Sequence, residues 1–150
     1  MLYELKRTFG KGLIDLDDTL FDMVGVTGAS QDVYAGDLDV DETPATAGYL
    51  DYEKANQHFP NENTLEIWGK ETADSSGDTA TVTITLQDSA DANTFGDLYS
   101  LTLLQAVIID GNLLFRATIP AHARRYLRLK VVTATEAFTA GKLLAFVRPL

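Results

Sequence analysis

Apolar and polar side chains alternate with a period of two from residue 64 onward, the pattern of strands with one buried face. The clearest predicted strand covers residues 79–86, where four threonines alternate with four aliphatic residues. One apolar face and one polar face are typical of strands in an antiparallel sheet. This part of the chain therefore predicts β-structure with a buried core on one side.

The same alternation predicts further strands, which turn signals separate. We expect them at residues 65–70, 99–109, 113–119, 126–131 and 142–148. Asp110-Gly111 predicts a hairpin turn, Ala140-Gly141 predicts the turn into the last strand, and residues 87–98 form a turn-rich loop. Several short strands at regular spacing indicate an all-β sandwich or barrel.

Residues 25–63 have no sustained period, and Pro44 and Pro60 interrupt them. Residues 49–58 are the best candidate for a short helix. Tyr49, Tyr52 and Phe59 lie in this polar stretch, which favours packing on the body or on a partner over a plain linker. We expect one domain over residues 1–150, with a possible arm at 1–12 and a long loop or arm at 25–63.

The composition of the chain excludes several kinds of site and disfavours several kinds of partner. The 150-residue chain has no cysteine, which excludes disulfides, thiolate metal sites and a cysteine nucleophile. It has no apolar run near the ~20 residues that span a bilayer, so the default expectation is a cytoplasmic protein or an assembly made there. A net charge of −10 disfavours nucleic acid as a partner of the whole surface.

Charge is distributed unevenly along the chain. Residues 112–150 carry seven Lys or Arg and one acid, whereas residues 1–111 carry five bases and 21 acids. Alternation places Tyr126, Arg128 and Lys130 on one face, and we expect Arg116 and Arg148 on adjacent strands. Two interpretations stay open: a docking surface, in which Arg and Tyr are enriched, or cross-strand pairing with acids from the first part of the chain.

The segment at residues 13–22 contains Asp15-Leu16-Asp17-Asp18-Thr19, which resembles the DxDxT signature of haloacid dehalogenase-like phosphatases. The resemblance implies Asp15 as nucleophile, Asp17 as general acid and base, and Mg²⁺ as cofactor. That family uses a doubly wound parallel sheet, whereas no helical period follows Thr19. An edge strand or loop with solvated acids is the favoured interpretation.

Other constellations are weaker. Residues 37–41 have the alternating acids of a calcium loop but lack its glycine and final glutamate. Asp88, Asp91 and Asn93 suit Asx turns better than a cation site, and His58 and His122 share no metal-ligand spacing. Three aromatic residues allow a carbohydrate-binding interpretation, although core or interface packing is more common for such rings: Trp68, Tyr99 and Tyr126. We expect no catalytic residue, no metal and no cofactor.

The C-terminal half resembles the jelly-roll capsid cement, or decoration, proteins of tailed bacteriophages. Five elements carry the resemblance: the Thr/Val strand and QDS loop at 79–98, Phe95, the Ile119-Pro120 strand end, the RYLRL strand at 125–129, and the FTAGK turn at 138–142. The first 63 residues match less well. The resemblance implies an all-β, jelly-roll-like antiparallel β-sandwich with an extended N-terminal arm and loop region.

The resemblance also implies a structural virion protein and not an enzyme. Such proteins sit on the outer surface of the icosahedral shell, bind the major capsid protein, form homodimers or homotrimers, and bridge capsomers. No nucleic acid or membrane partner is expected. The candidate interface residues are Arg116, Tyr126, Arg128, Lys130, Arg148, Tyr49, Tyr52 and Phe59. A carbohydrate-binding module is the main alternative, and the phosphatase is the enzyme alternative.

Overall fold

The computed structural model describes residues 14–15, 31–33, 50–51 and 63–149. These residues form strands and a single-turn 3-10 helix, η3. In chain order they are β1 (Ile14–Asp15), β2 (Gln31–Val33), β3 (Leu50–Asp51), β4 (Asn63–Ser75), β5 (Thr81–Ser89), β6 (Gly96–Leu104), η3 (Gln105–Val107), β7 (Leu113–Thr118), β8 (Tyr126–Ala134) and β9 (Phe138–Pro149).

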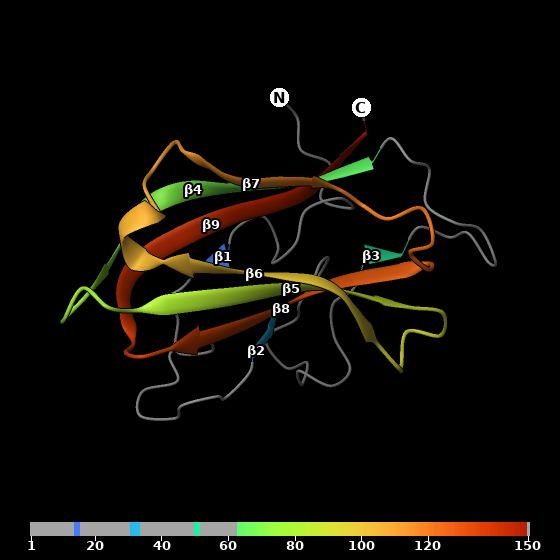
Figure 1. Ribbon diagram of the computed structural model, residues 1–150, viewed down its shortest axis with the longest axis horizontal. Coiled ribbons are helices and arrows are strands. Elements are labelled where there is room, and N and C mark those ends of the chain that lie inside the picture. The colour runs from blue at the N-terminus through green and yellow to red at the C-terminus, as the bar shows by residue number, and fades with distance from the viewer. Residues whose placement is uncertain (1–13, 16–30, 34–49, 52–62, 150) are drawn as a thin grey trace.

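The strands form two packed antiparallel sheets, as Figure 1 shows. The β4 sheet has the order β1-β9-β4-β7, and the β5 sheet has the order β2-β8-β5-β6 with β3 also paired to β8. The hairpin pair β5–β6 is nested inside β4–β7, which is nested inside β2–β8 and then β1–β9. A long ribbon of nested antiparallel pairs, rolled into two layers, is the topology of a jelly roll. The predicted all-β, jelly-roll-like sandwich is therefore confirmed.

The core lies between the layers and consists of the apolar halves of the alternating strands. Its central side chains are fully or almost fully buried: Leu65, Ile67, Val82, Ile84, Leu86, Leu127, Leu129, Val131, Leu143, Ala145 and Val147. Each large side chain removed from water in this way contributes about 1.5–3 kcal/mol to folding. The alternation read from the sequence therefore assigns the buried faces of β4, β5 and β8 correctly.

The threonines of β5 point to the outer face of the β5 sheet, where they join hydroxyl groups of β6. The hydroxyls of Thr83 and Thr102 lie 2.8 Å apart, and those of Thr85 and Ser100 lie 2.7 Å apart. Cross-strand hydroxyl pairs of this kind stabilise a sheet. They attach β6, an edge strand of this sheet, firmly to its neighbour.

The predicted hairpin at Asp110-Gly111 is wrong. Gly111 does adopt a left-handed turn conformation with φ of +85°, but the strands on either side do not pair. The chain leaves β6 at Leu104, forms η3, and crosses to the other layer, where Gly69 on β4 donates its backbone N–H to Asn112 at 2.9 Å. The turn at Gly111 is present, but the local sequence does not determine which sheet the next strand joins.

Two other boundaries differ from the prediction. Gln87 and Asp88 belong to β5, and the turn of the β5–β6 hairpin is confined to residues 90–95. Ala140 and Gly141 lie inside β9, where the register with β4 shifts and Gly141 has a φ of +134°. This glycine therefore serves a strand irregularity, and the turn before β9 is at residues 135–137.

The N-terminal predictions fall largely outside the described residues. The predicted helix at 49–58 is wrong at Leu50–Asp51, which pairs with β8 as β3, and its remaining residues are outside the described part. The arm at 1–12 is also outside it, as is the loop at 25–63 apart from β2 and β3. Asp15 ends β1, an edge strand of an antiparallel sheet, and not the parallel strand that the phosphatase signature requires.

Candidate functional site

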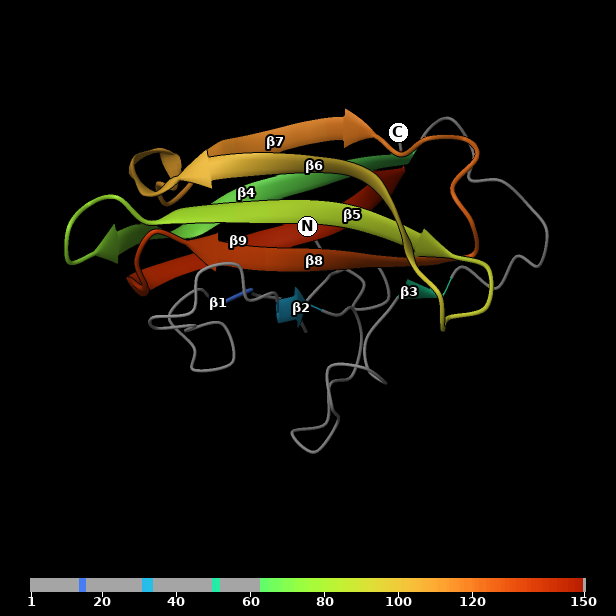
Figure 2. The ribbon, with the colours of Figure 1, turned by 60° about the horizontal axis from the view of Figure 1, so that its bottom comes forward.

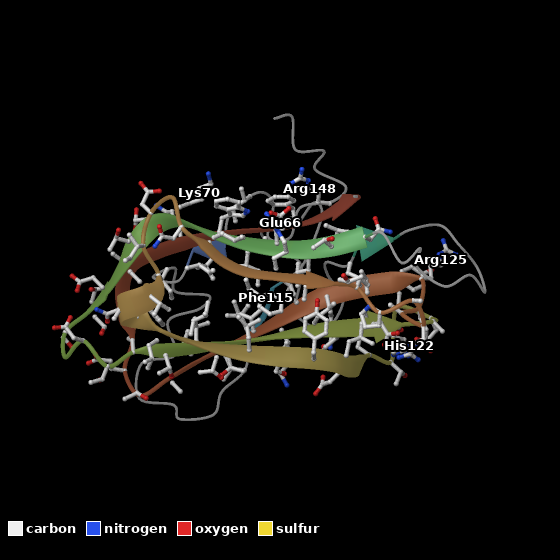
Figure 3. All side chains as sticks on the ribbon, turned by 45° about the horizontal axis from the view of Figure 1, so that its top comes forward. Glu66, Lys70, Phe115, His122, Arg125 and Arg148 are labelled. Carbon is white, nitrogen blue, oxygen red and sulfur yellow. The ribbon has the colours of Figure 1, made fainter. Side chains whose placement is uncertain are left out.

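A carboxylate held between two arginines lies on the outer face of the β4 sheet. We call Glu66, Arg116 and Arg148 the Glu66 cluster. Arg116 of β7 stands opposite Glu66 of β4 and donates to its Oε1 at 2.8 Å, while Arg148 of β9 donates to Oε2 at 3.4 Å. Glu66 is 1% exposed, whereas the arginine side chains are 50% and 49% exposed. Figure 3 shows Glu66 and Arg148 on this face.

The charge state of the cluster follows from its geometry. Burial by itself raises the pKa of Glu66, but the hydrogen bonds and positive charges of Arg116 and Arg148 outweigh it and hold the pKa below its ordinary value. The carboxylate is therefore ionised at neutral pH. Two guanidinium groups against one carboxylate leave the cluster with one net positive charge, and the half-exposed arginines can donate to an anion outside the chain.

The outer face of the β5 sheet carries a second set of basic and aromatic side chains, the β8 row, which we define as Tyr126, Arg128 and Lys130. All three are half-buried and alternate with the core positions of β8. The guanidinium of Arg128 lies 4.0 Å from the ring centroid of Phe95, and its Nε donates to Gln87 Oε1 at 2.7 Å. The stacking and the hydrogen bond fix the direction of the Arg128 side chain. The predicted shared face of these three residues is confirmed.

Arg116 and Arg148 do not lie on strands adjacent to the β8 row, so that part of the prediction is wrong. Their strands β7 and β9 both pair with β4, whereas β8 pairs with β5. The chain passes from one layer to the other between β7 and β8 and again between β8 and β9, which separates the basic strands. The basic residues expected on one surface therefore lie on two surfaces, on opposite layers of the sandwich.

Many of the basic residues in the C-terminal part of the chain form ion pairs with acidic residues of the first part. In addition to the two arginines of the Glu66 cluster, Arg124 bonds to Asp88, and Lys142 lies 3.3 Å from Glu71. The acids of these pairs all come from residues 1–111, as the pairing interpretation expected. The Lys142–Glu71 pair is 35% and 40% exposed, so it contributes little to stability.

Asp88 anchors the segment that leads into β8. Its Oδ2 accepts from the backbone N–H of Arg124 at 2.8 Å and from Nε at 3.0 Å, and its Oδ1 accepts from Nη2 at 2.8 Å. Burial alone raises the pKa of Asp88, but these bonds lower it below its ordinary value. Arg124 is thus a structural residue that positions the start of the β8 row.

Glu136 is the single acid of residues 112–150, and it joins two turns. Its carboxylate accepts hydrogen bonds from the hydroxyl of Ser75 and from the backbone N–H groups of Thr79, at 2.8 Å, and Gly77, at 2.9 Å. The Ser75 hydroxyl, followed by these backbone donors, lowers the pKa of Glu136 to about 2. The turn before β9 is thereby attached to the turn before β5, a contact that the sequence did not reveal.

No group of three or more potential metal ligands occurs among the described residues. Asp91 forms the expected Asx-type turn: its Oδ1 accepts from the backbone N–H groups of Asn93 and Thr94, both at 2.9 Å. The Thr94 and Asn93 amides lower the pKa of Asp91 to about 2. Asp88 is engaged by Arg124, so Asp88 and Asp91 do not share a site. The acids at 37–41 and His58 lie outside the described residues.

The three aromatic residues of the carbohydrate interpretation lie on three different surfaces. Trp68 is on the outer face of the β4 sheet, in register with Leu144, and Tyr126 is on the outer face of the β5 sheet. Tyr99 points inward from β6, with its ring centroid 5.8 Å from that of Phe115 on β7. They therefore form no common platform for a sugar ring. The remaining candidate interface residues, Tyr49, Tyr52 and Phe59, lie outside the described part of the chain.

One apolar surface was missed at the sequence level. Four exposed large hydrophobic residues lie in or beside the connection from β6 to β7: Leu104, Val107, Ile109 and Leu113. The signal that marks the region in the sequence is the absence of any charged residue at 98–109. The sequence predicted residues 99–109 as one apolar strand, which is wrong beyond Leu104, where β6 ends and η3 begins.

A family model described as Bbp16 matches residues 35–147, about three quarters of the chain. No curated protein matches the sequence. Within the described residues, no helix is long and apolar enough to cross a membrane.

Proposed function

The chain belongs to the Bbp16 family, and we propose that it is a capsid cement protein of a tailed bacteriophage. In this role it binds the outer surface of the icosahedral shell and stabilises contacts between neighbouring capsomers. Its partners are the major capsid protein and further copies of itself. It performs no catalysis and needs no cofactor.

The observation that carries the proposal is the β8 row, a set of basic and aromatic side chains held at fixed positions on the outer face of the β5 sheet. A protein that bridges two capsomers needs at least two contact surfaces in a fixed relation. Two copies of the row, one from each subunit of a homo-oligomer, provide them. The continuous core keeps each row in place, because the layers of the sandwich do not slide past each other without breaking the packing.

Charge supports the same role. The chain carries a net charge of −10, and yet its outer faces present arginines held by Glu66, Gln87 and Phe95. Such side chains lose little additional freedom on binding, because their geometry is already set. They suit acidic groups at fixed positions on a shell. Weak contacts of this kind become strong together when one protein engages several sites of a lattice.

The sequence resemblance to cement proteins adds support, since its most recognisable elements occupy defined positions in the jelly roll. The 79–98 stretch forms the β5–β6 hairpin, and the RYLRL stretch forms the start of β8. The two alternatives have less support. The aromatic residues of a carbohydrate site do not share a surface, and Asp15, the implied nucleophile of the phosphatase, lies in β1 of an antiparallel sheet.

Cosedimentation tests the proposal. Expanded capsids of the encoding phage, prepared without this protein, are mixed with increasing amounts of the purified chain and pelleted. We expect saturable binding to assembled shells, no binding to unassembled capsid subunits, and a higher melting temperature of the occupied shell. Absence of the chain from the pellet at saturating concentration would refute the cement role. Binding on a glycan array without binding to capsids would favour the carbohydrate module.

A further inference from the structure

The strands β6 and β7 form one open side of the sandwich. β6 is the last strand of the β5 sheet and β7 is the last strand of the β4 sheet, and each pairs with a single strand among those described. Figure 2 shows them side by side, and the 5.8 Å contact between the rings of Tyr99 and Phe115 joins them. Edge strands carry unpaired backbone N–H and C=O groups that can pair with another chain.

This side also carries the exposed apolar surface of the described residues. Leu104 is 59% exposed, Val107 46%, Ile109 44% and Leu113 39%, and no other large hydrophobic residue among residues 63–148 is exposed. The hydrophobic residues that pack on the core while only partly buried lie on the same two strands: Leu98, Tyr99, Leu101, Leu114 and Phe115. Exposed apolar surface gathered in one place marks an interaction site.

Most of β6 and all of η3 lack the features that normally prevent strand association, whereas β7 carries the half-exposed Arg116. Natural edge strands are protected by lysines, prolines or inward-pointing charges. Residues 98–109 contain no charged residue and no proline, and they cover most of β6 and all of η3. An isolated protomer therefore leaves this side incomplete.

A second copy of the chain fits this side better than a different partner does. Protomers with a net charge of −10 repel each other, so association is favoured through a surface without acids, and residues 98–109 contain none. A two-fold axis normal to the sheets places β6 antiparallel to β6 of the second copy and β7 antiparallel to β7. Both edges are then paired at once, whereas a single added strand from another protein would cover one.

We propose that the edge formed by β6, η3 and β7 binds the same edge of a second copy around a two-fold axis, which makes the protein a homodimer. This inference deepens the homo-oligomer that the proposed cement role includes, by naming its surface and symmetry. The two sheets of each protomer continue into those of its partner. The β8 row stays accessible in this dimer, because β5 and β6 lie between β8 and the two-fold axis.

Sedimentation velocity without capsids tests the dimer. The wild-type chain is expected to sediment at twice its 16.4 kDa mass at micromolar concentration. The double variant Leu104→Lys/Val107→Lys should dissociate at least about 100-fold more readily, because it places charges in an apolar contact. The control Ala121→Lys/Thr139→Lys adds the same two charges at exposed positions outside this edge and should remain dimeric. A monomeric wild type, a trimer, or an unchanged mass for the first variant would overturn the proposal.

Cysteine crosslinking tests the interface in the folded wild-type background. The chain has no cysteine, so a single Ser100→Cys or Thr102→Cys on β6 can form a disulfide only between copies. Under mild oxidation we expect a covalent dimer from at least one of them, because antiparallel pairing of β6 with itself brings positions near the axis within disulfide distance. A dimer that crosslinks at neither position would place the interface elsewhere. A dimer that fails to bind capsids would remove the cement role alone, whereas a monomer that binds them would remove this inference alone.

Discussion

The buried carboxylate of Glu66 is shielded from water and is paired with two arginines. It is 1% exposed and lies 2.8 Å from Arg116 and 3.4 Å from Arg148. Glu66→Gln would leave both arginines facing a neutral amide. Breaking a fully buried pair costs about 3–5 kcal/mol, but these arginines are half exposed and can rehydrate. We therefore expect a loss of about 1–3 kcal/mol in the free energy of unfolding, measured by urea denaturation.

A matched control for this variant is Glu71→Gln. Glu71 is 40% exposed, and its partner Lys142 is 35% exposed at 3.3 Å. An ion pair in that setting contributes less than about 1 kcal/mol. If Glu71→Gln lowered the free energy of unfolding as much as Glu66→Gln, burial of Glu66 would not explain the loss of stability in the Glu66 variant.

Glu136 should make stability depend on pH in the acid range. Its carboxylate bonds to the hydroxyl of Ser75 and to two backbone amides, and its pKa is lowered from 4.5 to about 2. A group whose pKa is lower in the folded state stabilises the fold above its unfolded value and loses that effect as pH falls through the folded value. Stability supported by Glu136 should therefore decline between about pH 5 and pH 2.

The measurement is the melting temperature of wild type and Glu136→Gln across that pH range. The variant keeps an oxygen that accepts hydrogen bonds but has no charge to titrate. We expect its melting temperature to fall less steeply than that of wild type below about pH 5. Parallel curves for the two proteins would show that Glu136 does not contribute to acid unfolding, and Asp91, whose pKa is also lowered to about 2, would become the next candidate.

At the scale of elements, Gly69 controls how closely the β6–β7 connection packs on β4. A Cβ atom at this position would lie 2.2 Å from the carbonyl oxygen of Ile109, and the Gly69 carbonyl accepts from Gly111 N–H at 3.0 Å. Backbone cannot move aside as a flexible side chain can. Gly69→Ala should therefore destabilise the fold by about 2 kcal/mol or more in denaturant unfolding.

Gly111→Ala provides the comparison within the same connection. Nothing lies within 4 Å of a Cβ at this position, but its φ of +85° disfavours any side chain. The expected loss is the conformational cost alone, about 1–2 kcal/mol. A smaller effect at Gly69 than at Gly111 would mean that the connection shifts to accommodate the methyl group and is less rigid than its hydrogen bonds indicate.

The sequence predicted the elements better than their connections. Alternation identified the strands and their buried faces, because a period of two is a local property that burial imposes directly, as at Val82, Ile84 and Leu86. It did not predict that Asp110-Gly111 links two sheets or that Gly141 lies within β9. Those outcomes depend on which distant strand supplies the hydrogen bonds, and turn residues contain no such information.

The candidate site was predicted in the same uneven way. The β8 row was correct because its members share one strand, so alternation alone places them on one face. Arg116 and Arg148 were assigned to the wrong layer because their positions depend on the winding of the jelly roll. The partner Glu66 was not singled out, and Asp88 was assigned to an Asx turn and not to an ion pair, since an acid has the same local pattern whether it is solvated or paired.

At the scale of the whole molecule, the sandwich separates three kinds of surface. The β4 sheet carries two arginines, one charge of which Glu66 neutralises, the β5 sheet carries the β8 row, and the β6–β7 side is apolar. In a dimer formed through the apolar side, a two-fold axis normal to the sheets keeps both β8 rows on one layer. Two copies of a basic row on the same side provide a bivalent surface for an acidic shell.

This arrangement predicts that the β5 sheet faces the capsid, and a matched pair of charge reversals tests it. Lys130 lies on the outer face of the β5 sheet, and Lys70 is an exposed residue in the middle of β4 in the other layer. Lys130→Glu should weaken capsid binding about 10-fold at low salt and less at high salt, because screening already reduces the attraction there. Lys70→Glu, with the same change in net charge, should change binding less than about 2-fold. Adding Arg128→Glu to Lys130→Glu should weaken binding further.

The sedimentation mass of these variants separates the two possible uses of the β8 row. β8 is separated from the β6 edge by β5, so Lys130→Glu and Arg128→Glu/Lys130→Glu should remain dimeric while their capsid binding falls. Dissociation of the dimer by these changes would place the subunit interface on β8, where the arginines would pair with acids of the second copy. Equal loss of capsid binding for Lys70→Glu and Lys130→Glu would mean instead that the shell attracts the chain through its overall charge and not through one layer.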